Sequence, residues 1–187
     1  MNRHTRYGST AKSLHWAVAT LIAAQVFVGL VMPHIGRNTE VEFWISLHFS
    51  LGALTMLAIF FRIAWRLSHA APASIGLPKW QQWASHATHA ALYLLMLVTP
   101  VLGWGNVSSR GWDVSLFGLF QLPRLTETGS IIGSAMGDIH VALVYVMLGL
   151  IGVHVLAALY HHFVLRDHVL REMLPSLPDS RKAQGIA

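Results

Sequence analysis

The sequence predicts an all-α integral membrane protein, a four-helix bundle with both termini in the cytoplasm. Hydrophobic residues fill 54% of the 187 positions and charged residues only 11%, with a mean hydropathy of +0.51, whereas soluble domains carry about 25% charged residues. Four apolar runs reach the roughly 20 residues that a helix needs to cross the bilayer, namely 14–32, 45–65, 86–107 and 140–164. One membrane domain therefore accounts for residues 1–187, with a polar tail over 166–187.

The distribution of cations sets the expected orientation, because lysine and arginine gather in cytoplasmic loops. With the N-terminus inside, the inner segments hold ten of these residues and the outer loops hold only Arg37, Arg110 and Arg124. The outer loops also carry five of the eight acidic residues. We interpret the net charge of +5 as a signal of topology, and it gives no support for binding to nucleic acid.

The first run, 14–32, is expected to stay in the protein as a span that begins after Ser13, a plausible N-cap. Its apolar core of about 19 residues is longer than that of a signal peptide, and no small-residue cleavage site follows it. The second run, 45–65, comes after a short outer loop. The inner linker 66–85 contains Pro72, Gly76 and Pro78, which is typical of a connection between helices.

The third run, 86–107, contains Pro100 and Gly103, which predict a kink. The long outer loop 108–137 includes the apolar stretch Trp112–Leu125, which is too short to span. We expect that stretch to lie at the interface, over the outer end of the bundle. The fourth run, 140–164, leads to a tail after Arg166 that is expected to fray.

Histidine is the metal-ligating residue that the sequence offers. Cysteine is absent, which excludes disulfides, iron–sulfur clusters and covalently attached c-type haem. Ionisable residues inside membrane spans are functional candidates by default. His140 and His154 lie fourteen residues apart on the fourth run, so both rings face one side of the helix, about 21 Å apart along its axis.

Each of these two histidines finds a partner at its own depth. His48 begins the second run at the outer side, level with His140, and His15 begins the first run at the inner side, level with His154. Bis-histidine ligation of haem iron fits each pair, so we predict two b-type haems with these four axial ligands. Gly52, Gly149 and Gly152 would let a flat macrocycle or a neighbouring helix come close.

Other interpretations of these histidines stay open. The rings can also be interfacial side chains that form hydrogen bonds with a neighbouring helix. A zinc ion is less suitable, because no carboxylate or cysteine lies at the same depth. His86 and His89 can line a quinone pocket, relay protons or replace His15 as a ligand, or they are simply interfacial. His161 is a second candidate for the inner site, or part of a solvated helix end. The histidines assigned to loops and tails are His4, His34, His69 and His168.

Four stretches together resemble the bacterial cytochrome b561 family: KSLHWAVATLIAAQVFVGL, WISLHFSLGALTMLAIFFRIAWR, ASHATHAALYLLMLVTPVLGW and GDIHVALVYVMLGLIGVHVLAALYHHFVLRDHVLREMLP. The likeness covers about Arg6–Pro178, including the outer-loop sequence SSRGWDVSLFGL. It implies a four-helix dihaem cytochrome of the bacterial inner membrane. It also implies one axial ligand from each of the first two helices and two from the fourth, at the positions of His15, His48, His140 and His154.

The resemblance further implies a function. A family member is a superoxide:ubiquinone oxidoreductase, which takes electrons from superoxide at the outer haem and delivers them to ubiquinone. The alternative is an electron carrier or membrane anchor for a partner redox protein, as in the cytochrome subunits of hydrogenases. Arg37, Arg110 and Arg124 would steer superoxide, or they are ordinary loop charges. An ion transporter lined by histidine is a third class, and it would be colourless.

Overall fold

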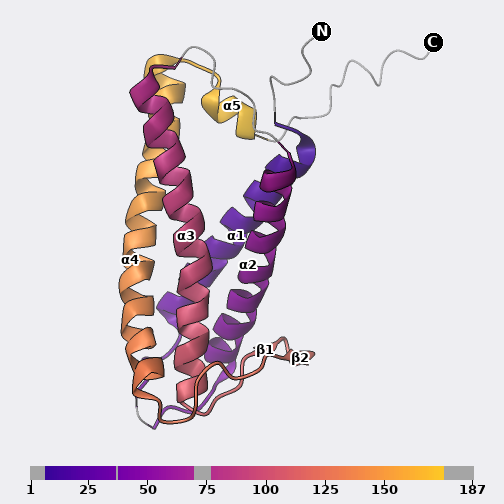
Figure 1. Cartoon of the computed structure of the whole chain (residues 1–187), viewed down its shortest axis with the longest axis vertical. Helices are drawn as coiled ribbons and strands as arrows, with labels where there is room; N and C mark the ends of the chain where they lie inside the picture. The colour runs from indigo at the N-terminus through magenta and orange to yellow at the C-terminus, as the bar shows by residue number, and fades with distance from the viewer. Residues whose placement is uncertain (1–6, 37, 70–76, 175–187) are drawn as a thin grey trace, which may run out of the picture.

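Four long apolar helices build the molecule (Figure 1). The computed structural model describes residues 7–36, 38–69 and 77–174. Within these ranges the long helices are α1 (Ser9–Val31), α2 (Phe43–Ser68), α3 (Lys79–Ser109) and α4 (Ile131–Tyr160). Each is long and apolar enough to cross a membrane, so the prediction of an all-α membrane bundle is confirmed. The side of the membrane on which the termini lie stays a prediction.

The helices extend beyond the apolar runs. α1 begins at Ser9 with Gly8 as its N-cap, so the prediction of a start after Ser13 is wrong. α3 starts directly after Pro78, and α4 starts after Ser130, whose hydroxyl accepts a hydrogen bond from the N–H of Gly133 at 3.2 Å. Hydropathy marks only the part of a helix that lies in hydrocarbon, and the backbone stays helical beyond it until a cap or a proline intervenes. α3 also continues as a helix through Pro100.

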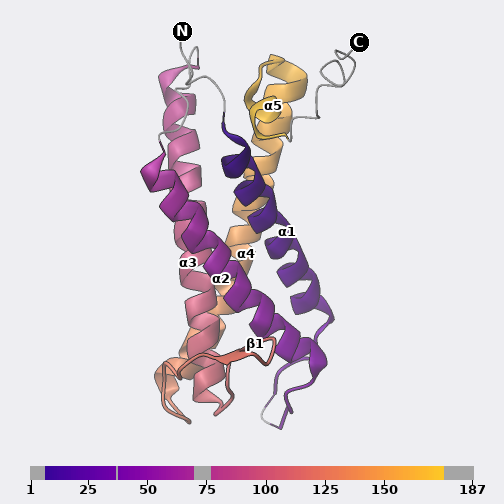
Figure 2. The same ribbon diagram turned by 90° about the vertical axis from the view of Figure 1, so that its right-hand side faces the viewer.

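The helices associate as two pairs, α1 with α2 and α3 with α4, with a smaller contact between α2 and α3 (Figures 1 and 2). Most large side chains face outward; Leu30, for example, is 79% exposed and Leu156 is 67% exposed. This exposure suits helices whose surroundings are lipid. The buried core that all four helices share is Val18, Ile59, Leu92, Met96 and Met147.

Met147 marks the level of this shared core on α4. It lies seven residues from His140 and seven from His154, so it faces the same side of the helix midway between them. It is buried, whereas Tyr145 and Val146 beside it are exposed. An apolar layer to which every helix contributes therefore separates the two histidine levels.

α3 and α4 approach closely at the end of the bundle where α3 ends and α4 begins, which we call the outer end after the side of the membrane predicted for it. Gly105 and Gly133 face each other there: a Cβ on Gly133 would lie 2.5 Å from the Cβ of Ser109 and 3.0 Å from the carbonyl oxygen of Gly105. Small residues allow this approach of membrane helices. Asn106 reinforces it, because its side-chain amide donates to the Gly133 carbonyl at 3.1 Å.

Replacing Gly133 with alanine is expected to weaken the bundle by about 1–3 kcal/mol, because the new methyl group meets backbone that cannot move aside cheaply. The free energy of unfolding in mixed detergent micelles measures the effect. Ser134→Ala, at the neighbouring exposed position of the same helix, is the control and should change little. Equal stability of the two variants would mean that α3 and α4 are farther apart than described.

The outer loop folds into a small hairpin. β1 (Ser115–Leu116) pairs antiparallel with β2 (Phe120–Gln121), at the end of the bundle opposite α5 (Figure 1). The hydroxyl of Ser50 donates to the Ser115 carbonyl at 2.8 Å and accepts from the N–H of Phe117 at 3.0 Å. Val114 packs in a buried cluster with Ile45, Phe49 and Val107. The segment Trp112–Leu125 thus packs against the first turns of α2 in the form of a hairpin; its place at the membrane interface stays a prediction.

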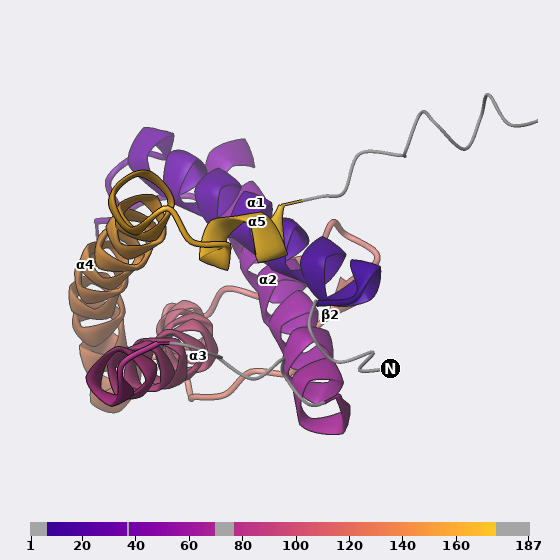
Figure 3. The ribbon, with the colours of Figure 1, turned by 90° about the horizontal axis from the view of Figure 1, so that it is seen from above.

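The prediction that the tail frays after Arg166 is wrong for its first residues. α4 widens into the π-helix η1 (His161–Leu165), and Arg166 adopts a left-handed φ of 54° that reverses the chain. The short helix α5 (Val169–Met173) then folds back over the bundle end (Figure 3). Trp16 donates to the Met173 carbonyl at 2.8 Å and Lys12 to the Leu174 carbonyl at 3.0 Å. Two hydrogen bonds to α1 therefore anchor this segment; residues 175–187 lie outside the described ranges.

Candidate functional site

The outer histidine pair consists of His48 on α2 and His140 on α4. Their ring centres lie 6.3 Å apart, with the ring planes at 81°. Both rings are half-buried, and His48 sits beside the region of α2 that the hairpin covers. The structure therefore brings together the two residues that topology paired at the outer level.

The position of the His140 ring is set by α3. Its Nδ1 lies 2.8 Å from the carbonyl oxygen of Thr99, and because a carbonyl only accepts, this nitrogen carries the proton. Gly103 makes room for the ring: a Cβ there would be 3.0 Å from both Cε1 and Nδ1 of His140. The lone pair is then on Nε2, the arrangement in which a backbone carbonyl orients a metal-ligating histidine.

His48 carries an orphaned polar atom. Its Nδ1 is buried and has no hydrogen-bond partner among the described residues. Gly29 of α1 lies against the ring, since a Cβ there would be 3.5 Å from Cε1 of His48. A buried nitrogen without a partner is costly. Because Nδ1 also lies against Gly29, Nε2 is the ring nitrogen left to bind a ligand.

The inner level holds three histidines. The ring centres of His15 and His154 lie 6.4 Å apart at 64°, and those of His89 and His154 lie 5.3 Å apart at 74°. His89 also forms a hydrogen bond with the Ser85 hydroxyl at 3.3 Å. His86 is exposed, and its Nδ1 lies 2.7 Å from the Gln82 carbonyl of its own helix. Of the two histidines that open the third run, only His89 reaches the inner pair.

The dimensions of both pairs fit a shared metal. Two imidazoles on opposite sides of one ion place their ring centres about 6.3 Å apart, because a metal–nitrogen bond of about 2 Å and half a ring lie on each side. The observed separations are 6.3 and 6.4 Å. In the described ranges α4 does not pack closely along α1 or α2, so each pair joins helices that stand apart. In these ranges no three His, Cys, Asp or Glu side chains, the three inner histidines included, are arranged so that they could hold a metal ion.

Other residues considered in the sequence have different surroundings. His161 pairs with Asp167, and burial, which disfavours the carboxylate, is outweighed by hydrogen bonds from His161 and the Val169 N–H, so the pKa of Asp167 lies below its usual value. His161 is thus engaged at the helix end. Gly52 lies against Gln25 of α1, whereas a Cβ on Gly149 or Gly152 would meet no protein atom within 4 Å.

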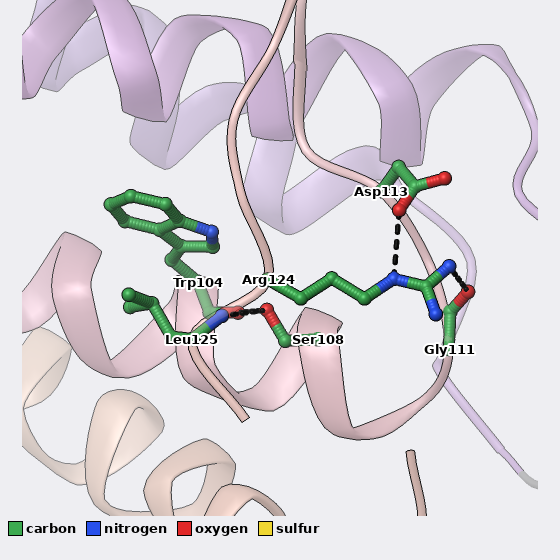
Figure 4. Close-up of polar contacts among 6 residues, drawn as sticks. All are labelled: Trp104, Ser108, Gly111, Asp113, Arg124 and Leu125. Atoms are coloured by element: carbon green, nitrogen blue, oxygen red, sulfur yellow. Dashed lines mark hydrogen bonds and ion pairs between the residues drawn. The ribbon is translucent and has the colours of Figure 1, made fainter. Parts of the chain in front are cut away.

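The outer cations are part of the loop structure. Arg124 forms an ion pair with Asp113 at 2.8 Å and donates to the Gly111 carbonyl (Figure 4). Arg110 donates to the carbonyl of Gly36 at 3.1 Å and lies 5.5 Å from the Trp112 ring centre, with no carboxylate partner in the described ranges. Arg37 lies outside those ranges. Of the two outer arginines that the structure describes, Arg124 is therefore paired with a carboxylate and Arg110 is not.

Sequence reasoning missed two features of the site. The Thr99 carbonyl is a backbone atom of an apolar run, and no sequence signal identifies it. Arg62 is one of the ten cations assigned to the inner segments, yet it lies inside the apolar run 45–65, where an ionisable residue is a functional candidate as much as the histidines are. The structure turns Arg62 toward Tyr93 of α3.

The chain is similar to known membrane cytochromes along most of its length. The family model described as Prokaryotic cytochrome b561 matches residues 6–176. Cytochrome b561 homolog 2 of Escherichia coli (strain K12) is 29% identical over 92% of this chain and 93% of its own. The Probable superoxide oxidase CybB of Yersinia pestis is 26% identical over 92% of this chain and 97% of its own. Cytochrome b561 homolog 1 of the same Escherichia coli strain is 25% identical over 91% of this chain and 97% of its own.

Proposed function

Because the chain belongs to the prokaryotic cytochrome b561 family, we propose that it is a dihaem cytochrome that oxidises superoxide at the outer face of the membrane and reduces ubiquinone. Family membership and four membrane-spanning helices make it a multi-pass electron-transfer protein of the bacterial inner membrane that binds b-type haem. The number of haems, their ligands, the donor and the acceptor are the proposal.

The proposal depends mainly on one observation, that two histidine pairs lie at two levels of the bundle with similar ring separations. His48 and His140 would hold one haem at the outer level, and His15 and His154 would hold a second at the inner level, at ring separations of 6.3 and 6.4 Å. Each haem, when bound, would carry one electron at a time. With two histidines to hold each haem, neither site would leave a free position for oxygen, so these residues would suit transfer of electrons.

The polypeptide contributes orientation and exclusion of water. Thr99 and Gly103 fix the tautomer and position of the His140 ring. The apolar layer around Met147 keeps water from the region between the two levels. The hairpin covers the outer end of α2 beside His48. Superoxide as donor draws support from the similarity to the Probable superoxide oxidase CybB.

The deciding experiment uses the purified protein without any partner. Reduced-minus-oxidised spectra should show b-type bands that titrate as two haems per chain, and added superoxide should reduce a soluble ubiquinone analogue. A protein that holds both haems but reduces quinone only when a partner protein is added would be a carrier instead. The hairpin tip, where Leu119 is 89% exposed and Phe120 is 61% exposed, is the surface on which such a partner would be sought.

Electrostatic steering of superoxide gives a separate prediction. Arg110→Gln is expected to lower the superoxide-driven rate by about two- to fivefold at low ionic strength. The difference should disappear as salt shortens the screening length to about 8 Å. Arg66→Gln removes the same charge from the opposite end and should leave the rate unchanged. A loss at Arg110 that is equal at every salt concentration would indicate damage to the loop and would contradict steering.

A further inference from the structure

Arg62 is a charged residue inside a membrane-spanning helix. It lies on α2, within Phe43–Ser68. Its Nε donates to the hydroxyl of Tyr93 at 3.1 Å, and its guanidinium carbon lies 5.8 Å from the Tyr93 ring centre. Tyr93 belongs to α3 and packs against the buried core with Leu92 and Met96. The side chain is thus held against the bundle by a neighbouring helix.

The charge of Arg62 has no counter-charge in the described part of the chain. The ion pairs there are Arg124–Asp113 and His161–Asp167, and neither includes Arg62. Its Nη1 is buried and has no hydrogen-bond partner. An unpaired cation at membrane depth is unfavourable, and a buried charge without a partner destabilises the folded protein strongly. The arrangement therefore calls for an anion from outside the polypeptide.

Arg62 stands next to the inner histidine pair. It stands fourteen residues after His48 on α2, and its partner Tyr93 lies one turn beyond His89 on α3; the ring centre of His89 is 5.3 Å from that of His154. The charge of Arg62 acts on Tyr7, just before α1: burial raises the pKa of the Tyr7 phenol, and the positive charges of Arg66 and Arg62 oppose that rise. The unpaired Nη1 is therefore at the same end and level as the proposed inner haem.

We propose that Arg62, oriented by Tyr93, binds a propionate carboxylate of the haem held by His15 and His154. The inference rests on the proposed function, since it needs a haem at that pair. A b-type haem carries two carboxylates, and a planar guanidinium matches a carboxylate with two parallel hydrogen bonds. The carbonyl of a quinone is neutral and would leave the buried charge uncompensated. Arg62 is then a cofactor-binding residue that also tunes the potential of the inner haem.

The test is redox titration of Arg62→Gln beside Arg66→Gln, which removes an equal charge from an exposed position one turn away. A nearby cation favours the reduced haem. Arg62→Gln should therefore lower the equilibrium constant for reduction of one haem at least tenfold, about 59 mV for one electron, while the other haem is unchanged. Arg66→Gln should shift either haem by less than threefold. Equal behaviour of the two variants would overturn the inference.

A second measurement separates direct contact from a field effect. Infrared difference spectra are recorded on protein whose haem carries ¹³C in its propionate carboxylates. The labelled band should move in Arg62→Gln and in Arg62→Lys, which keeps the charge but loses the planar fork, and should stay in Arg66→Gln. If Arg62→Gln does not accumulate, Arg62→Lys decides by the same band. An unmoved band overturns the contact.

The outcomes keep this inference apart from the proposed function. A wild-type protein without haem at the inner pair would contradict the proposed function, whatever Arg62 does. If the wild type holds two haems, but neither the labelled band nor the haem potentials change in Arg62→Gln, only the role of Arg62 is contradicted. A change confined to the KM for the quinone analogue would place the guanidinium at the quinone and would also overturn the contact with propionate.

Discussion

Replacing His140 with alanine is expected to remove the outer haem and to leave the inner one in place. The variant loses the ring that the Thr99 carbonyl orients, so His48 has no partner across the 6.3 Å gap. The bundle should survive, because the shared core around Met147 lies between the two levels and does not depend on the outer pair. The haem content per chain should fall from two to one, measured by total haem and by redox titration.

The same result is expected for His48→Ala, and the control is His34→Ala in the exposed outer loop. Electron transfer from superoxide should fall by more than tenfold in both site variants, while chemical reduction of the remaining haem persists. The pairing is contradicted if each variant, still folded, loses both haems equally. Retention of both haems in His140→Ala would remove α4 from the outer site.

The inner site gives the second large effect, because His154 has two neighbours. His15 lies at 6.4 Å, close to the outer-pair value, whereas His89 lies at 5.3 Å, which is short for two imidazoles on opposite sides of one metal. His15→Ala should therefore lower the haem content from two to one. His89→Ala should keep both haems. Both variants are checked by the haem content per chain and by redox titration of the inner haem.

Ser85→Ala is the companion of His89→Ala, since it removes only the hydroxyl that forms a hydrogen bond with His89 at 3.3 Å. If His89 acts near the acceptor, both changes should slow quinone reduction without loss of haem. The assignment of His15 fails if His89→Ala loses the inner haem and His15→Ala retains it. Loss in both variants would mean that the inner site needs all three histidines.

The fold could be predicted from the sequence because hydrocarbon imposes a simple rule. A span must be long, apolar and helical, and the four runs meet that rule. The ends of the helices could not be predicted in the same way. Ser9, Lys79 and Ile131 begin helices outside the apolar runs, because caps and prolines decide where a helix starts. The fold-back of α5 depends on contacts with Lys12 and Trp16, which are distant in the chain.

The histidine pairs could be predicted for a related reason. Antiparallel spans of fixed rise place residues at known depths, so a spacing of fourteen residues and the order of the helices were enough to match His48 with His140 and His15 with His154. Depth does not give the lateral position of a side chain. The sequence therefore left His86 and His89 equivalent, and the structure separates them, because only His89 lies beside His154.

By itself, the sequence determined the number of spans and the level of each histidine, since both follow from helix rise and the thickness of the bilayer. Tertiary structure alone decided which groups surround each ring: the Thr99 carbonyl at His140, the unpartnered Nδ1 of His48 and the unpaired guanidinium of Arg62. These contacts depend on how the helices are rotated and how closely they cross. Rotation and crossing are set by packing between helices, at sites such as Gly103 and Gly133, and not by the hydropathy of any one of them.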